Sequence, residues 1–303
     1  MSNYLIAGGT GFIGKPLCQL LLSQGHKVTI LTTQRQKLSQ DNLIQYVYWN
    51  TQQHKIEMEA CDTSFRVINL AGAGIADKRW TASRKKELLQ SRLDPLITLL
   101  IAVKQHRFHI EHLVSASAIG YYGNQTQLCT EVTPGDESFL SQICQAWEEA
   151  RLPFEELQIP VAIVRLGIVL GNDRGAFKEL MAPLHYKLAA IPGSGKQIYS
   201  WIHLEDVCRI FFELGHQYKT GVFNAVAPNP ATMDNLIDEM RHYHPSWLRL
   251  HVPEFLLKLI LGEMAIEVTK STQVSSRKIE DMGFNFHFTT LQEAVKNLLS
   301  ASE

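Results

Sequence analysis

Residues 4–14 read Tyr4-Leu5-Ile6-Ala7-Gly8-Gly9-Thr10-Gly11-Phe12-Ile13-Gly14, an apolar run that passes directly into glycines at positions 8, 11 and 14. From Phe12 to Gln24 apolar residues recur at helical spacing, so the pattern predicts a strand, a tight turn and a helix. Glycine lets the backbone approach a pyrophosphate, and the helix N-terminus supplies free N–H groups and partial positive charge. We therefore expect a dinucleotide site at Gly8, Gly9, Thr10, Gly11, Phe12, Ile13 and Gly14. The alternative is a glycine-rich turn that binds nothing.

The alternation of short apolar runs and helical patterns continues to about residue 170. Further strands are predicted over 28–31, 46–49, 67–70, 113–115 and 161–166, and helices over 82–105 and 141–152. Pro95 is expected to kink or restart the first of these helices. Repeated strand–helix units predict an α/β protein whose parallel sheet is covered by helices on both faces.

The regular alternation ends near residue 170, which predicts a second, smaller lobe. A helix over 201–214 and a strand over 222–226 are expected to return to the sheet, and helical patterns follow at 235–243, 254–261 and 291–299. We therefore expect residues 1–170 with 198–227 to form the dinucleotide-binding domain. Residues 171–197 and 228–303 are expected to form a smaller α+β substrate lobe.

The composition excludes several classes of protein. Of 303 residues, 45% are hydrophobic and 19% charged, which is typical of a folded globular chain. Lys and Arg number 29 against 30 Asp and Glu, a net charge of −1, so nucleic acid and anionic membranes are not expected partners. The five cysteines contain no Cys-x-x-Cys pair, and neither a disulfide framework nor a metal site is predicted. No secretory signal or 18-residue apolar run is readable, so the expected location is cytoplasmic.

The charge near the glycine loop is uneven. The first 40 residues hold four Lys or Arg and no carboxylate. NAD-specific proteins place an acidic residue after the second strand, but here Thr32, Thr33 and Arg35 follow it and the first acid is Asp41. This favours NADP, with the two threonines and Arg35 near its 2′-phosphate. The alternative is that the cationic side chains are only solvated.

Three more motifs carry a resemblance to a known superfamily. They are Asn69-Leu70-Ala71-Gly72, Ser115-Ala116-Ser117-Ala118-Ile119-Gly120-Tyr121-Tyr122-Gly123 and Arg165-Leu166-Gly167-Ile168-Val169-Leu170-Gly171. With the glycine loop, these resemble the extended short-chain dehydrogenase/reductases. The resemblance implies a Rossmann-like doubly wound parallel sheet, a nicotinamide cofactor, and cofactor contacts from Leu70, Ala71 and Gly72.

Other segments are similar to one atypical branch, the epimerase family proteins. They are residues 75–80, Cys144 with Trp147-Glu148, residues 200–203 with Asp206, and Asn224 with Pro228. Residues 261–263 and 283–286 resemble the C-terminal domain of unknown function of that branch.

The resemblance also locates the catalytic residues that are typical of the superfamily, and two of them are absent from this sequence. In the superfamily a Ser orients the substrate carbonyl, a Tyr transfers a proton, and a Lys lowers the pKa of that Tyr. Counted from Trp147-Glu148, the Tyr and Lys positions hold Leu140 and Cys144. Ser117 keeps the serine position, and Tyr121 or Tyr122 is the hypothetical acid/base. The alternative is that both tyrosines only pack, and a thiol at position 144 is expected to be inert.

Substrate contacts are predicted after the strand at 67–70. Asp77, Lys78, Arg79 and Trp80 could bind an anionic substrate, although solvated charges are the simpler interpretation. His203 and Asp206 are expected to make helix-start hydrogen bonds rather than bind metal.

The sequence thus predicts an NADP-binding oxidoreductase or epimerase acting on an unidentified small molecule. The alternatives are a non-catalytic NADP-binding regulatory or scaffold protein, and an NAD-dependent nucleotide-sugar epimerase. The missing Tyr and Lys weaken the last of these. The oligomeric state is not predicted.

Overall fold

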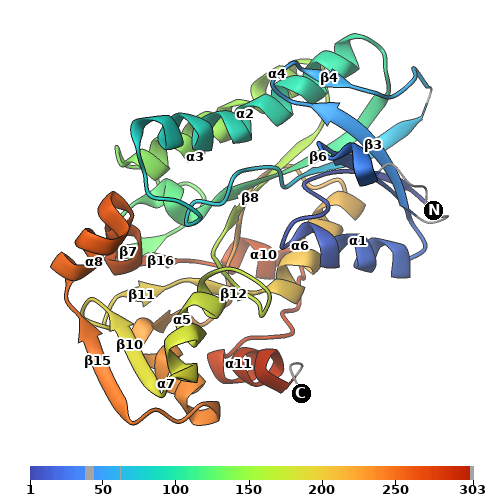
Figure 1. The fold of residues 1–303 in the computed structure, drawn as a ribbon. Coiled ribbons are helices and arrows are strands. Elements are labelled where there is room, and N and C mark those ends of the chain that lie inside the picture. The colour runs from blue at the N-terminus through green and yellow to red at the C-terminus, as the bar shows by residue number, and fades with distance from the viewer. Residues whose placement is uncertain (38–43, 62, 301–303) are drawn as a thin grey trace.

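The computed structural model describes residues 1–37, 44–61 and 63–300, so Asp41 lies outside the described residues. An eight-stranded sheet forms its centre (Figure 1), in the order β13-β8-β6-β5-β1-β2-β3-β4. The strands are β1 (Asn3–Ala7), β2 (Lys27–Thr32), β3 (Ile44–Asn50), β4 (Lys55–Ile56), β5 (Ser64–Asn69), β6 (His109–Ala118), β8 (Val161–Leu166) and β13 (Gly221–Ala225). All neighbours pair in parallel except β3 and β4. The predicted strands and the doubly wound α/β class are confirmed.

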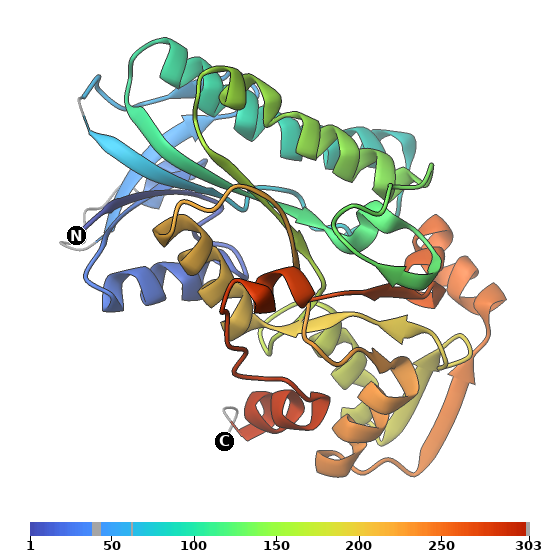
Figure 2. The ribbon, with the colours of Figure 1, turned by 180° about the vertical axis from the view of Figure 1, so that it is seen from behind.

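Helices cover both faces of this sheet. One layer holds α1 (Gly14–Ser23) and α6 (Leu204–His216), and the other holds α2 (Ala82–Lys104), α3 (Phe139–Glu149) and α4 (Leu152–Glu156), as Figure 2 shows from behind. Pro95 lies inside α2, which continues past it, so the helix does not restart there, and a kink at Pro95 stays a prediction.

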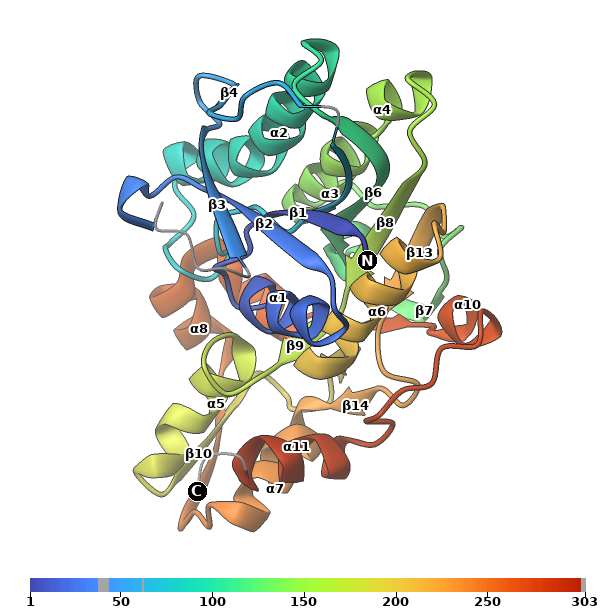
Figure 3. The same ribbon diagram turned by 90° about the vertical axis from the view of Figure 1, so that its right-hand side faces the viewer.

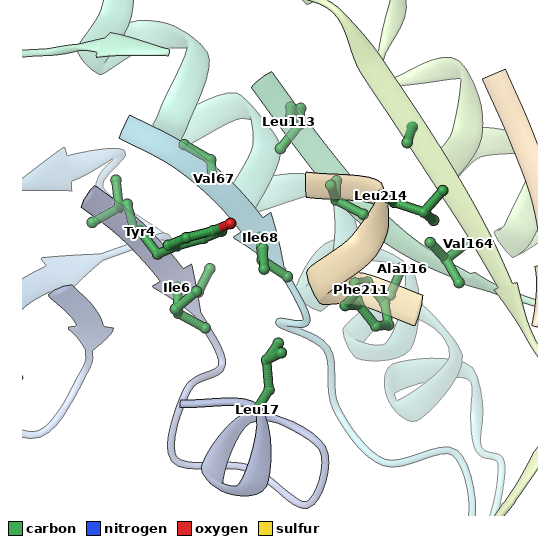
Figure 4. Packing of buried hydrophobic residues seen from close by; sticks show 14 of the residues in the cluster. Tyr4, Ile6, Leu17, Val67, Ile68, Leu113, Ala116, Val164, Phe211 and Leu214 are labelled. Atoms are coloured by element: carbon green, nitrogen blue, oxygen red, sulfur yellow. The ribbon is translucent and has the colours of Figure 1, made fainter. Parts of the chain in front are cut away.

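The chain reverses its direction across the sheet between β1 and β5. It first builds outward through β2, β3 and β4, and then returns to add β5, β6, β8 and β13 on the other side. β1 at this switch point is fully buried from Tyr4 to Ala7. Tyr4 and Ile6 pack with Leu17 of α1 and with Val67 and Ile68 of β5 (Figure 4). Open α/β sheets bind ligands beyond the carboxyl ends of the strands at such a point.

A second group of elements lies below the sheet in Figure 3 and has its own apolar core. Its four-stranded sheet has the order β14 (Ala231–Thr232), β11 (Ile198–Tyr199), β16 (Thr272–Val274) and β7 (Gln125–Cys129). Two strand pairs accompany it, β10 (Leu188–Pro192) with β15 (Leu248–Val252) and β9 (Ile168–Leu170) with β12 (Trp201–His203). Its helices are α5 (Ala176–His185), α7 (Met233–Tyr243), α8 (Glu254–Leu261), α9 (Ala265–Thr269) and α11 (Leu291–Ser300), whereas α10 (Arg277–Asp281) packs on β13 of the large sheet. The short 3-10 helices are η1 (Arg35–Lys37), η2 (Ile119–Tyr122) and η3 (Gly262–Met264).

Two expectations about this part need correction or qualification. The helix predicted over 201–214 begins only at Leu204, because Trp201–His203 form strand β12. The domain boundaries stay a prediction, and one strand of the second sheet, β7, comes from residues 125–129 inside the first predicted range.

Hydrogen bonds at the start of α6 connect the C-terminal segment to this helix, which packs on the large sheet. His203 Nδ1 accepts the N–H of Glu205 at 3.1 Å, so the predicted helix-start hydrogen bond is confirmed. The buried Asp206 carboxylate accepts the N–H groups of His287 and Phe288 at 2.9 and 3.0 Å.

Within the described ranges, no cluster of three or more His, Cys, Asp or Glu side chains is arranged to hold a metal ion. Nor does any described helix have the length and apolar character needed to span a bilayer.

Replacing Gly14 by Ala is expected to destabilise the protein by about 3 kcal/mol, because helix α1 touches the loop before it. A Cβ on Gly14 would lie 2.1 Å from the backbone oxygen of Gly8. Thermal unfolding should show a Tm lower by about 6 °C or more.

The control is Gly215→Ala in α6, where a Cβ would make only ordinary contacts, 3.5 Å from Tyr4. Because alanine favours helix over glycine, this variant should be neutral or more stable. Equal losses in the two variants would contradict the close-contact explanation.

Candidate functional site

The glycine loop and the segment after β5 lie against each other. Gly8 has φ of +82°, and a Cβ there would be 2.9 Å from the carbonyl of Leu70. The N–H of Gly11 donates to the oxygen of Gly8 at 2.9 Å, which closes the turn. The buried Asn69 side chain accepts the N–H of Ala71 at 3.3 Å and fixes the path of residues 70–72. Residues 8–14 and 70–72, predicted separately, therefore form one surface at the switch point.

The loop presents unused hydrogen-bond donors. The backbone N–H groups of Thr10, Phe12 and Ile13 have no acceptor among the described residues. They stand at the start of α1, where the helix dipole also favours negative charge. This donor set fits the pyrophosphate of a dinucleotide.

The end of β2 carries an ion pair that the sequence did not indicate. Thr32 is buried, Thr33 is exposed, and the Arg35 guanidinium forms a two-bond pair with the Glu57 carboxylate. The hydrogen bond from Arg35 holds the pKa of Glu57 below its usual range. Arg35 also stacks on Tyr48, with its Cζ 3.7 Å from the ring centroid. Arg35 is therefore present at the predicted position, but a carboxylate already binds part of its donor set.

A cavity of about 220 Å³ opens where β6 and β8 end and the second sheet begins. Ala118, Gly120 and Gly167 line it from the ends of these strands. Leu140 and Cys144 also line it, so the positions counted for the missing Tyr and Lys do face this space. Burial raises the pKa of the Cys144 thiol to about 11, which leaves it protonated and unreactive near neutral pH.

Ser117 lies beside the cavity but is held in a buried ion-pair network. Its hydroxyl donates to Glu148 Oε1 at 2.7 Å. Arg165 donates to both oxygens of Glu148, from Nε and from Nη2, each at 2.8 Å. Burial lowers the pKa of Arg165, but the hydrogen bonds and charge of Glu148 raise it further, so the guanidinium stays charged. Ser117 thus has a carboxylate as its acceptor.

The two tyrosines belong to the same network. The Tyr122 hydroxyl donates to Asn224 at 2.6 Å and accepts from Arg165 at 2.9 Å. Burial raises its pKa to about 12. The ring of Tyr121 lies under the Arg165 guanidinium, 3.4 Å from its Cζ. Neither tyrosine is among the residues that line the cavity. The arrangement gives the acid/base hypothesis no support and matches the packing alternative.

The predicted substrate loop is only partly directed inward. Trp80 is buried, and its indole N–H donates to the oxygen of Ile75 at 3.0 Å. Asp77, Lys78 and Arg79 are exposed, and among residues 75–80 only Ile75 lines the cavity. The assignment of these charges to substrate binding stays a prediction.

Three charged residues that sequence analysis missed line the cavity. Arg92 comes from α2, Glu267 from α9, and Lys270 from the residue after α9. Lys270 Nζ lies 2.5 Å from Glu267 Oε2. No motif indicated them, because Arg92 is a single charged residue within a helical pattern, and Glu267 and Lys270, three residues apart, lie far from it in the sequence.

Comparisons with known proteins agree with this geometry. The model of the NAD dependent epimerase/dehydratase family matches residues 4–225, and a domain of unknown function, DUF1731, matches residues 252–298. An epimerase family protein of Staphylococcus aureus is 36% identical over 311 residues, covering 99% of this chain and all of the relative.

Solved structures are similar over almost the whole chain. A human epimerase family protein, determined with NADPH, is 29% identical with a TM-score of 0.87 and covers 98% of this chain and 99% of its own. A UDP-glucuronic acid 4-epimerase from Bacillus cereus, determined with UDP-glucuronic acid and NAD, is 18% identical with a TM-score of 0.78 and covers 98% of each chain. The second likeness shows the fold alone.

Replacing Glu148 by Gln is expected to cost about 3 kcal/mol of unfolding free energy, because Arg165 would keep a buried, unpaired charge. Urea unfolding measures this loss.

Replacing Tyr122 by Phe should cost about 1–3 kcal/mol, since buried Asn224 and Arg165 each lose a partner. The control Tyr218→Phe removes a hydroxyl that is also hydrogen-bonded but exposed, and should change stability by less than about 0.5 kcal/mol. A Tyr122→Phe protein as stable as the control would show that the network contributes little.

Proposed function

Because the chain belongs to the NAD dependent epimerase/dehydratase family, we propose that it binds NADP and acts as an oxidoreductase or epimerase on a small molecule in the cavity between the two sheets. The observation that carries the proposal is the glycine loop, whose free N–H groups meet residues 70–72 at the switch point of the sheet. The human relative determined with NADPH supports the choice of cofactor.

The loop residues are proposed to hold the dinucleotide. The N–H groups of Thr10, Phe12 and Ile13 would bind its pyrophosphate, and the backbone of 70–72 would lie along it. Thr32, Thr33 and Arg35 would face the 2′-phosphate. Bound NADP would supply or accept a hydride at the substrate carbon.

A proton must also move to or from the substrate oxygen. Tyr122 is poorly suited, because burial raises its pKa and its hydroxyl already has two partners. We assign this step instead to the Lys270 ammonium, which lines the cavity beside the Glu267 carboxylate. The ammonium would donate its proton to the substrate oxygen, and the resulting amine would take a proton back from solvent, while the Glu267 carboxylate holds the side chain in place. Ser117 then has a structural role as a donor to Glu148.

The second candidate is an NADP-binding regulatory or scaffold protein without turnover. The observation in its favour is that apolar Leu140 and an inert Cys144 stand in the cavity where Tyr and Lys would act. Binding of NADPH without turnover of any carbonyl compound would favour it.

NADPH is expected to bind at least tenfold more tightly than NADH, because the 2′-phosphate meets a guanidinium and no unpaired acid. Isothermal titration calorimetry measures both affinities. Arg35→Ala should remove most of the preference, and Glu57→Gln should keep or increase it by freeing Arg35. Lys27→Ala, at the opposite end of β2, is the matched control. Equal affinities in the unaltered protein would refute the NADP assignment.

Lys270→Met is expected to reduce turnover by about 10²–10⁴-fold when proton transfer contributes to the rate. The measurement is NADPH absorbance across a panel of aldehydes and ketones. Tyr121→Phe and Tyr122→Phe should retain the rate of the folded protein. A large loss in either tyrosine variant with none in Lys270→Met would reverse the assignment.

A further inference from the structure

Arg92 is a buried cation that has no acidic partner in the part of the chain that the structure describes. The structure describes three buried arginines, Arg84, Arg92 and Arg165. Arg84 pairs with Glu87 at 2.8 Å and Arg165 with Glu148 at 2.8 Å. Among the described residues, no carboxylate lies within ion-pair distance of Arg92. A buried charge costs several kcal/mol unless an opposite charge compensates it.

The guanidinium of Arg92 is fixed by neutral groups that leave donors free. Nη1 donates to the oxygen of Leu88 at 2.8 Å and reaches Ser91 Oγ at 3.5 Å, and Nη2 donates to the oxygen of Ala73 at 3.2 Å. These bonds use at most three of its five N–H groups. Its Cζ stands 5.1 Å from the ring centroid of Trp147, which also lines the cavity. These contacts fix the orientation of the Arg92 guanidinium and leave some of its N–H groups free to bind a ligand.

The surroundings of Arg92 are positive and mostly apolar. The charged side chains in the lining are Arg92, Lys270 and Glu267, two positive charges against one negative. The rest of the lining on the Arg92 side is apolar, including Leu140, Ile143 and Trp147. Burial also lowers the pKa of the Arg92 guanidinium, because removal from water disfavours its charged form.

The volume limits what can bind. The cavity of about 220 Å³ is smaller than the ~300–1,000 Å³ typical of sites for drug-sized ligands. Whatever share a nicotinamide ring occupies reduces the remaining space. A nucleotide sugar is too large to lie wholly inside such a space, whereas an acid with a few carbon atoms or one ring fits within it.

We propose that the cavity selects a small, largely apolar carboxylate, and that Arg92 is the residue that binds its acid group. This rests on the proposed function in naming the substrate class of the same site. The carboxylate would take the free N–H donors of Arg92 and compensate its charge, while its apolar part packs on Trp147 and Leu140. The reactive oxygen of the substrate would then face the wall that holds Lys270.

The test compares carboxylates with neutral amides of the same shape. The NADP-loaded protein is titrated with propionate and propionamide, hexanoate and hexanamide, and benzoate and benzamide, with thermal shift and calorimetry as readouts. We expect at least one carboxylate to bind at least tenfold more tightly than its amide. If no carboxylate binds better than its amide, the proposal is wrong, and this comparison needs no variant.

Substitution then locates the charge. Arg92→Met should weaken the carboxylate at least tenfold, and Arg92→Lys should weaken it less, because a cation remains without the planar fork. The matched control is Arg84→Met on the same helix, a buried arginine outside the cavity lining, which should leave carboxylate affinity unchanged. Circular dichroism and unliganded Tm confirm that each variant is folded. Unchanged carboxylate binding in a folded Arg92→Met protein would overturn the proposal.

Two further measurements separate sources of failure. A phosphate of the dinucleotide is the other anion that could reach Arg92, so the NADPH affinity of Arg92→Met is measured as well. Less than a twofold change supports the substrate assignment, whereas a tenfold loss with carboxylate binding intact overturns it. The carboxylate titrations are also repeated without dinucleotide. They then separate a failure of NADPH binding, which concerns the proposed function, from a failure of anion binding, which concerns Arg92.

Discussion

The buried ion pair between Arg165 and Glu148 connects the parts of this molecule that form the site. It joins β8 to α3, and through Ser117 it reaches the end of β6. Through Tyr122 and Asn224 it extends to β13 and to the backbone of Ser275 in the second group of elements. Two charges taken out of water are stable only with good geometry and full hydrogen bonding. Because that geometry has to be kept, the carboxyl ends of β6 and β8 are held in fixed positions beside the cavity.

The same constraint changes the chemistry available at the site. A serine that donates to a buried carboxylate, and a tyrosine held between an arginine and an asparagine, are bound to the protein rather than free for a substrate. Leu140 and Cys144 leave α3 without an acid or base in the cavity. The charged groups that remain come from α2 and from the region around α9. The second group of elements therefore completes the lining, instead of only covering it.

The glycine loop depends on residues that are close together in the sequence, whereas the cavity combines residues from distant segments. The loop needs a positive φ at Gly8 and a residue without a Cβ at position 14, where the chain lies against the backbone of Gly8. Glycines at these positions can be recognised directly in the local sequence. The cavity charges come from position 92 and from the i,i+3 pair at 267 and 270, and no spacing rule connects position 92 to that pair. Glu57 beside Arg35 is another such case, since 22 residues separate the two in the chain. Trp201–His203 form strand β12, although the sequence pattern predicts a helix there. An apolar run directly before an amphipathic helix does not show where a strand ends and the helix begins.

By itself, the sequence determined the parallel α/β sheet, the glycine loop at its switch point, and the absence of Tyr and Lys at the counted positions. These features are local or periodic, and steric limits on the backbone fix them within a few residues. Only the tertiary structure decided that Ser117 and Tyr122 serve the buried ion pair, that Arg35 meets Glu57, and that Arg92 faces the cavity with no carboxylate partner among the described residues. The physical reason is that the role of a charged or hydroxyl side chain depends on which partner reaches it inside the folded protein, and those partners come from distant parts of the chain.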